Sequence, residues 1–324
     1  MRYLINDSTD PYYNMAFDQW CLEHPICDAP VFYLWQNRPA VIIGLNQNAW
    51  NEVNTTYLRE HDIALVRRVT GGGAVYHDLQ NLNYTIVGRS ADLDRDYPLY
   101  TSMIARALCT MGVDARLSGR NDIMVGGLKV SGFAKRVWKD RLMVHGTLMY
   151  DVDIETLTKV LDTPGSKMHA KGIASVRTRV GNLRDCLHSV RSVSELKEGL
   201  CDILAGGDSP IQPSPGQARE VEELAQDRFR SWEWNWGHSP KGDLERSAVL
   251  PCGSVHVNIC LENGLVSDIS LSGDYIGSLP SDAICSILKG CRYERNSILG
   301  RLSAVPVAAY FENTSVEQLS NAII

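Results

Sequence analysis

The sequence lacks several features that mark specialised classes of protein. Its nine cysteines are an odd and scattered set without a C-x-x-C pair, which argues against a disulfide framework or a zinc site and favours reduced thiols. No apolar run approaches the roughly 18 residues of a membrane span, and the first residues turn polar too soon for a signal peptide. We therefore expect a cytoplasmic protein with no membrane partner.

Positive charge is not in excess either. The net charge is −6, whereas nucleic-acid-binding proteins usually have a basic balance or a basic stripe, so we expect no nucleic-acid partner. The hydrophobic fraction of 44% and the charged fraction of 22% are those of an ordinary globular protein. A chain of 324 residues is long enough for two domains, and we place the boundary between residues 244 and 245.

Two common nucleophiles are also missing. No cysteine lies between Cys109 and Cys186, which excludes a thiol nucleophile on the strands expected near Lys129 and His145. No G-x-S-x-G elbow is present, so a serine hydrolase is not supported.

The densest chemistry lies in residues 67–81, RRVTGGGAVYHDLQN. Apolar runs at 63–66 and 82–87 predict strand, glycine turn, strand. The arginines supply fixed positive charge, and three glycines leave N–H groups open to an anion. The turn is neither a Walker loop, because no Gly-Lys-Ser/Thr follows, nor a dinucleotide fingerprint, because Tyr76 stands at the last glycine position. An anion or nucleotide site is favoured over a plain tight turn.

The elements expected around this turn indicate an α+β fold with a mostly antiparallel sheet, since short strands follow one another without intervening helices. Hairpins are predicted for 31–35 with 40–44, 122–125 with 128–131, 133–138 with 142–150, and 254–261 with 265–271. Helices are predicted for an amphipathic segment starting at Asp10-Pro11 and for 54–61, 98–111, 153–161, 192–205, 216–229, 281–288, 295–303 and 315–322. The alternating Trp232, Trp234 and Trp236 are expected to pack the end of the first domain.

The predicted hairpins at 122–150 carry candidate functional residues, each with a plainer alternative. A lone lysine such as Lys129 is usually a solvated edge residue. His145, within an apolar strand, is equally a hydrogen-bonded core histidine. Asn121 and Asp122 could cap a turn or bind a cation. These residues gain significance only if the hairpins face the glycine turn.

Four stretches in this order resemble lipoate–protein ligases, a family that includes lipoyltransferases and is related to biotin–protein ligases. Residues 67–81 are similar to R-R-x-[ST]-G-G-G-x-V-[FY]-H-D-x-G-N. Asn121-Asp122, residues 129–134 and residues 145–148 are similar to N-D, K-[IV]-[SG]-G-[SN]-A and H-G-[TS]-L. Residues 171–183 are similar to K-G-[IV]-x-S-V-[RK]-[SA]-R-V-x-N-L, and residues 232–240 to W-x-W-x-[FY]-G-x-[ST]-P.

The resemblance implies a biotin/lipoate ligase-like catalytic domain at 1–244 and a small α+β accessory domain at 245–324. It implies ATP-dependent ligation of lipoate to a specific lysine through a lipoyl-AMP intermediate, with Mg²⁺ and with lipoate as substrate. The acceptors would be lipoyl domains of 2-oxoacid dehydrogenase E2 subunits or the glycine cleavage H protein. A lipoyltransferase that uses preformed lipoyl-AMP, and a non-catalytic lipoate-binding or scavenging protein, are the alternatives.

The family's residue roles carry over by position. Lys129 would be the catalytic lysine, contacting both the acyl carbonyl and the phosphate. The ATP and adenylate site would also contain Arg68, Thr70, Gly73, Ala74, Val75, Tyr76, Asn81 and Asp122. The lipoate pocket would also contain Arg136, His145, Gly146 and Thr147. Asp122 is in addition the candidate Mg²⁺ ligand. Three residues depart from the family pattern, namely Gln80, Phe133 and Val144, and they bear on pocket shape and acyl preference.

Overall fold

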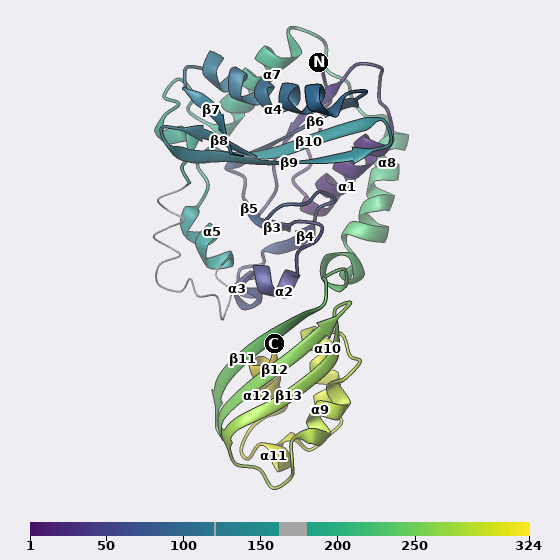
Figure 1. Ribbon diagram of the computed structural model, residues 1–324, viewed down its shortest axis with the longest axis vertical. Coiled ribbons are helices and arrows are strands. Elements are labelled where there is room, and N and C mark those ends of the chain that lie inside the picture. Colours follow the sequence, from purple (N-terminus) through teal and green to yellow (C-terminus); the bar gives the residue numbers. More distant parts are fainter. Residues whose placement is uncertain (120, 162–179) are drawn as a thin grey trace. The chain divides into compact units, whose positions relative to one another are not determined.

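The computed structural model describes residues 1–119, 121–161 and 180–324, which form two compact units (Figure 1). Of these residues, the first unit contains 1–45, 53–161 and 180–231, and the second contains 46–52 and 232–324. The boundary expected between residues 244 and 245 falls inside strand β11 (Gly242–Leu250).

A seven-stranded sheet with the order β1-β2-β6-β10-β9-β8-β7 is the centre of the first unit. Among the strands that the structure describes in this sheet, β1 and β2 are parallel neighbours and the other neighbours are antiparallel. The α+β class predicted from the sequence is confirmed. The strands are β1 (Arg2–Tyr3), β2 (Val31–Trp35), β6 (Asn81–Arg89), β7 (Ala115–Ser118), β8 (Asp122–Val125), β9 (Leu128–Trp138) and β10 (Arg141–Met149).

A second, three-stranded sheet has the order β4-β3-β5, with β3 parallel to β4 and antiparallel to β5. Its strands are β3 (Ala40–Ile43), β4 (Ala64–Arg67) and β5 (Val75–His77). The predicted hairpin of residues 31–35 with 40–44 is therefore wrong, because β2 and β3 enter different sheets. Every residue of both strands is buried. In β2, Phe32 and Leu34 join the core on one face of the sheet, and Tyr33 packs against Phe17 on the other.

Helices cover both faces of the seven-stranded sheet (Figure 1). α4 and α7 pack on one face, where their apolar side chains join those of the strands in one core. α1 lies on the other face, where it contacts β6 and β10 as well as β4 of the smaller sheet. The helices are α1 (Pro11–Glu23), α3 (Thr55–Glu60), α4 (Leu93–Thr110), α5 (Ile154–Val160), α7 (Val193–Ala205) and α8 (Pro215–Leu224), with short helical turns η1 (Leu183–Asp185) and η2 (Ala225–Phe229).

α1 starts as its sequence predicts, because the Asp10 carboxylate accepts a hydrogen bond from the Tyr12 N–H and Pro11 occupies the first turn. It is not the amphipathic helix that was expected. Most of its residues are buried, including the polar Asn14 and Asp18, because the helix lies between two sheets. A helix buried all round must have partners for its polar groups.

Helix α4 begins at Leu93 rather than at Pro98 as predicted. The Asp92 side chain accepts from the Arg95 N–H at 3.2 Å and caps this earlier start. None of the helices in the described part of the chain is both long and apolar enough to cross a bilayer.

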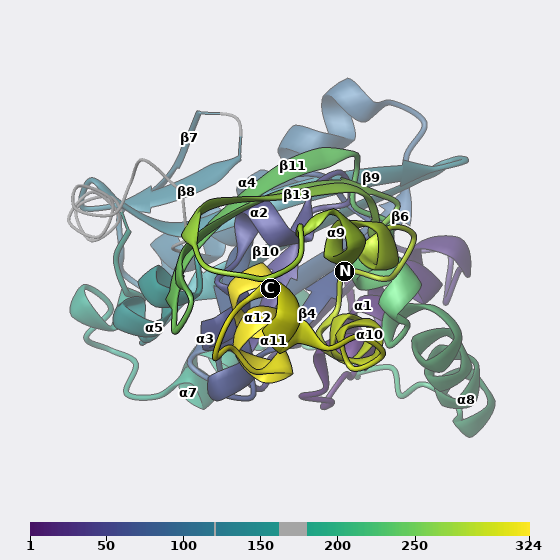
Figure 2. The ribbon, with the colours of Figure 1, turned by 90° about the horizontal axis from the view of Figure 1, so that it is seen from below.

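The second unit is a three-stranded antiparallel sheet with helices on one face (Figure 2). Its core joins alternate residues of β12, namely Val255, Val257 and Ile259, to apolar helix residues such as Leu288 and Leu319, as expected for a half-buried strand. Its elements are α2 (Ala49–Glu52), η3 (Glu233–Gly237), β11, β12 (Gly253–Glu262), β13 (Leu265–Tyr275), α9 (Asp282–Leu288), α10 (Arg295–Leu302), α11 (Val307–Tyr310) and α12 (Val316–Ile323).

Two of the clustered tryptophans pack within this second unit. The ring centroids of Trp232 and Trp236 lie 6.4 and 5.4 Å from that of Trp50, and the Trp50 ring meets Tyr293 edge-on. Both rings thus pack against the core of the second unit and not that of the first. Aromatic pairing with residues distant in sequence places them in the second unit's core.

Candidate active site

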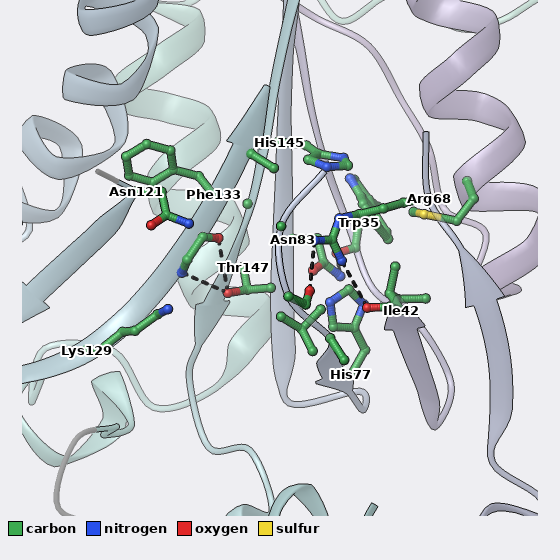
Figure 3. A pocket seen from close by; sticks show the side chains of 18 residues that line it. Trp35, Ile42, Arg68, His77, Asn83, Asn121, Lys129, Phe133, His145 and Thr147 are labelled. Atoms are coloured by element: carbon green, nitrogen blue, oxygen red, sulfur yellow. Dashed lines mark hydrogen bonds between the residues drawn. The ribbon is translucent and has the colours of Figure 1, made fainter. Parts of the chain in front are cut away.

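A pocket lies between the two sheets of the first unit and brings the glycine turn next to β9 and β10 (Figure 3). Strands of both sheets, the turn and α1 all contribute side chains to it. The lining residues are Met15, Trp35, Ile42, Arg68, Gly72, Gly73, Ala74, Val75, His77, Asn83, Asn121, Lys129, Gly132, Phe133, Ala134, His145, Gly146 and Thr147.

Arg68 holds the glycine turn from inside. Its Nη2 donates to the carbonyls of Gly71 and Gly73, each at 2.8 Å, and its Nη1 donates to the Ile42 carbonyl at 3.0 Å. Burial lowers the pKa of Arg68 to about 10, which leaves it charged at neutral pH. Since the C=O and N–H of a trans peptide point in opposite directions, these contacts turn the N–H groups of Gly72 and Ala74 away from the guanidinium and leave them to face an anion.

The turn also approaches β3 so closely that one position requires glycine. A Cβ added to Gly44 would lie 2.0 Å from the Gly72 carbonyl oxygen, which is backbone and cannot rotate away. A Cβ added to Gly71 would meet nothing within 4 Å. The two glycines therefore form a matched pair for mutation.

Gly44→Ala is expected to lower the free energy of unfolding by about 1–3 kcal/mol, because overpacking forces the glycine turn away from β3. Gly71→Ala should leave the free energy of unfolding unchanged or raise it slightly. Urea denaturation of the two variants beside the parent measures both effects. Equal stability of the two variants would contradict the close contact.

Lys129 lies across the pocket on β9 and pairs with Asp122 on β8. Its Nζ is 2.8 Å from the Asp122 carboxylate, and the two side chains are 36% and 32% exposed. Gly132 gives the ammonium room, since a Cβ there would lie 3.1 Å from Nζ. Lys129 is therefore a half-exposed cation at the pocket wall, able to exchange a carboxylate partner for a ligand anion.

A buried hydrogen-bond chain links α1 to the glycine turn through His145. The Asp18 carboxylate accepts from His145 Nδ1 at 2.6 Å, and His145 Nε2 is 2.8 Å from the Thr70 hydroxyl. The Thr70 oxygen also accepts from Arg68 Nε at 3.0 Å. Because the Nδ1–H group donates to the Asp18 carboxylate, Nε2 of a neutral ring accepts from the Thr70 hydroxyl. The chain fixes the orientation of the imidazole, the threonine and the arginine together.

Eight of the residues predicted for the site line the pocket, and five do not. The lining ones are Arg68, Gly73, Ala74, Val75, Lys129, His145, Gly146 and Thr147. The others are Thr70, Tyr76, Asn81, Asp122 and Arg136. Of these, Thr70, Asn81 and Asp122 contact lining residues directly, through His145, Asn83 and Lys129.

The remaining two are directed elsewhere. Tyr76 follows the lining residue Val75 on β5, and alternation along a strand sends its side chain to the opposite face. Arg136 donates to the Val69 carbonyl. Most of the similar stretch at 171–183 lies outside the described residues.

Sequence reasoning missed several contributors, among them Met15, Asp18, Trp35, Ile42 and Asn83. One signal was available for Asp18. Asn14 and Asp18 are four residues apart on a helix whose other positions are mainly apolar, and such a spacing places two polar groups on one face. No comparable signal existed for Trp35 or Ile42, which read as ordinary strand residues.

The three departures from the family pattern have different consequences. Gln80 does not need the conformational freedom of glycine, because its φ is not positive. Val144 is fully buried in the core with α4 and α7, on the face of β10 opposite His145. Only Phe133 lines the pocket, where its ring meets Tyr97, so this departure alone changes pocket shape.

Within the described residues, no cluster of three or more His, Cys, Asp or Glu side chains could enclose a metal ion. Mg²⁺ is often held by one or two carboxylates together with substrate phosphates and water. A single carboxylate beside the pocket, that of Asp122, is compatible with that mode of binding.

Family models match both parts of the chain. The model described as the lipoyl protein ligase A/B catalytic domain matches residues 10–205. The model described as the bacterial lipoate protein ligase C-terminus matches residues 239–323. The chain is 34% identical, over the full length of both proteins, to lipoate-protein ligase LplJ of Bacillus subtilis.

Solved structures of similar fold cover most of the chain. The bipartite lipoate protein ligase of Thermoplasma acidophilum, solved in work that included its E2 lipoyl domain, matches with a TM-score of 0.68 and 28% identity, covering 74% of this chain and 98% of that one. A lipoate-protein ligase A bound with ATP matches with a TM-score of 0.64 and 28% identity, covering 73% and 98%.

Proposed function

The chain belongs to the lipoate–protein ligase family, and from this premise we propose that it activates lipoate with ATP and transfers the lipoyl group to a lysine of an acceptor protein. The observation that carries the proposal is the pocket, in which the glycine turn, Lys129 and His145 meet although they are far apart in sequence. The ATP-bound structure of a similar ligase supports a nucleotide in the reaction.

In the first step, a lipoate carboxylate oxygen attacks the α-phosphorus of ATP. The new P–O bond forms as the bond to the β-phosphate oxygen breaks, which gives lipoyl-AMP and pyrophosphate. Lys129 Nζ and the N–H groups of the glycine turn stabilise the negative charge that builds on the phosphate oxygens. Mg²⁺ held by Asp122 and the phosphates would neutralise further phosphate charge.

In the second step, the ε-amine of the acceptor lysine attacks the acyl carbonyl and AMP leaves. The C–O bond to the phosphate breaks as the C–N bond forms, and the proton that the amine loses passes to the departing AMP or to water. We propose that Lys129 stabilises charge on the carbonyl oxygen as well, which the partly exposed position of its ammonium at the pocket wall supports. We propose that Arg68 and Thr70 act indirectly, by holding the turn, and that His145, Gly146 and Thr147 line the acyl end.

Pyrophosphate release separates this proposal from a transferase that only uses preformed lipoyl-AMP. We expect the purified protein to release pyrophosphate from ATP on addition of lipoate, without any acceptor protein. A coupled phosphate assay with and without lipoate measures it. Lipoyl transfer from added lipoyl-AMP, without pyrophosphate release from ATP and lipoate, would instead identify a transferase.

Lipoyl domains of 2-oxoacid dehydrogenase E2 subunits are the acceptors that we propose first, because a similar ligase was studied with its E2 lipoyl domain. The glycine cleavage H protein is a second acceptor to be tested in the same assay. We further propose that the first unit is catalytic and that the second, beginning near Trp232, is accessory. A cytoplasmic location is consistent with the nine cysteines, all of which are free.

A further inference from the structure

His77 lines the pocket but has no part in either step of the proposed reaction. Its side chain is 3% exposed, and its Nε2 atom has no hydrogen-bond partner within the part of the chain that the structure describes. Buried polar atoms are nearly always hydrogen-bonded, and a buried polar atom without a hydrogen-bond partner lowers the stability of the fold. An unmet group in a ligand pocket is therefore expected to find its partner on the ligand.

A series of three side chains, those of Asn14, Asn37 and His77, determines whether Nε2 of His77 donates or accepts a hydrogen bond. The amide nitrogen of Asn14 is 3.0 Å from the carbonyl oxygens of both Ser8 and Gln36. Carbonyls only accept, so this atom of Asn14 must be the donor. It also lies 2.8 Å from the side chain of Asn37, which must present its oxygen at that point.

The orientation of Asn37 then fixes the histidine. With its oxygen on Asn14, its Nδ2 donor lies 3.0 Å from Nδ1 of His77. Nδ1 therefore accepts, and the proton of the neutral ring is on Nε2. Burial, together with repulsion from Arg68 and His145, lowers the pKa of His77 to about 3, so the ring is neutral at physiological pH. The pocket thus contains a fixed and unmet N–H donor.

The position of this donor indicates which end of the substrate it meets. Lys129 and Asn121 lie on one side of the pocket, whereas His77, Trp35 and Ile42 lie on the other (Figure 3). The proposed reaction puts the lipoate carboxylate at Lys129, and in that orientation the dithiolane end of the acid would lie on the side of His77. The two ring sulfurs are weak hydrogen-bond acceptors, and the end of a saturated acyl chain has no acceptor.

We propose that the His77 Nε2–H group donates a hydrogen bond to a dithiolane sulfur and so makes the site prefer lipoate to acyl groups that lack sulfur. This inference rests on the proposed function and adds a specificity-determining residue to it. A sulfur-free acyl chain fills the same space but leaves the N–H unmet, and sites with an unmet polar group discriminate against such ligands.

The test compares lipoate with 5-cyclopentylpentanoate, in which carbon replaces both sulfurs and the ring size is kept. Pyrophosphate release gives kcat/KM for each acid. We expect the parent to favour lipoate and His77→Phe, which keeps a ring but removes the donor, to lower that preference by about 5-fold or more. His77→Gln, whose amide nitrogen reaches the place of Nε2, should retain most of it. An unchanged preference in His77→Phe would overturn the inference.

A nitrogen-15 NMR measurement on the parent protein decides the matter even if His77→Phe does not fold. The His77 signals, identified among the eight histidines by their loss in His77→Gln, should show a neutral ring protonated on Nε2. Lipoate should shift the Nε2 signal more than 5-cyclopentylpentanoate does. A proton on Nδ1, or equal shifts with both acids, would refute the role of His77 while leaving the ligase activity intact. No pyrophosphate release with either acid would instead refute the proposed function.

Discussion

Lys129→Ala is expected to slow pyrophosphate release from ATP and lipoate by about 10²–10³-fold, the cost of losing a positioned group that stabilises transition-state charge. Lys129 is the cation of β9 that lines the pocket, 2.8 Å from Asp122. The acyl transfer from added lipoyl-AMP should also be slowed, because we propose that the same ammonium stabilises charge on the acyl carbonyl oxygen. Steady-state rates of both half-reactions measure the two effects.

Lys135→Ala is the matched control, because Lys135 is on the same strand but exposed, with its Nζ 3.8 Å from the centre of the Tyr97 ring. Its rates should stay near those of the parent. The Lys129 pair with Asp122 is partly exposed and adds little to stability, so Lys129→Ala should unfold at nearly the parental urea concentration. A folded Lys129→Ala variant with adenylation within threefold of the parent would exclude the proposed role.

Asp18→Ala is expected to lower the free energy of unfolding by about 3–5 kcal/mol. The carboxylate is 1% exposed and accepts from His145 Nδ1 and from the hydroxyls of Tyr33 and Thr85, at 2.6, 2.7 and 2.9 Å. Removing it leaves three donors between α1 and the sheet without this acceptor. Urea denaturation gives the change directly.

Asp7→Ala serves as the comparison, since Asp7 is 77% exposed and forms only a surface pair with Lys197 at 3.3 Å. Loss of this pair should lower the free energy of unfolding by less than about 1 kcal/mol. Asp18→Asn keeps one acceptor oxygen, so its free energy of unfolding should lie between those of the parent and of Asp18→Ala. A cost for Asp18→Ala as small as that for Asp7→Ala would show that the buried chain to His145 does not stabilise the fold.

The sequence by itself determined the local features of this protein. The glycine turn, the Gly126-Gly127 hairpin, the capped start of α1 and the strand of Lys129 could be predicted because each depends on neighbouring residues. Gly126 and Gly127 have φ values of 58° and 83°, a conformation that other residues rarely adopt. The resemblance to lipoate–protein ligases likewise rested on short motifs, and the comparisons confirmed it.

Only the tertiary structure decided which strands pair and which distant side chains meet. β2 and β3 read as a hairpin because they are adjacent in sequence, yet β2 pairs with β1 and β6 whereas β3 pairs with β4 and β5. His145 is hydrogen-bonded to Asp18, which is 127 residues away in sequence, and to Thr70, which is 75 residues away. No local sequence pattern could therefore reveal the hydrogen-bond chain that orients the turn. The unmet N–H of His77 likewise depends on the orientations of Asn14 and Asn37, which packing alone determines.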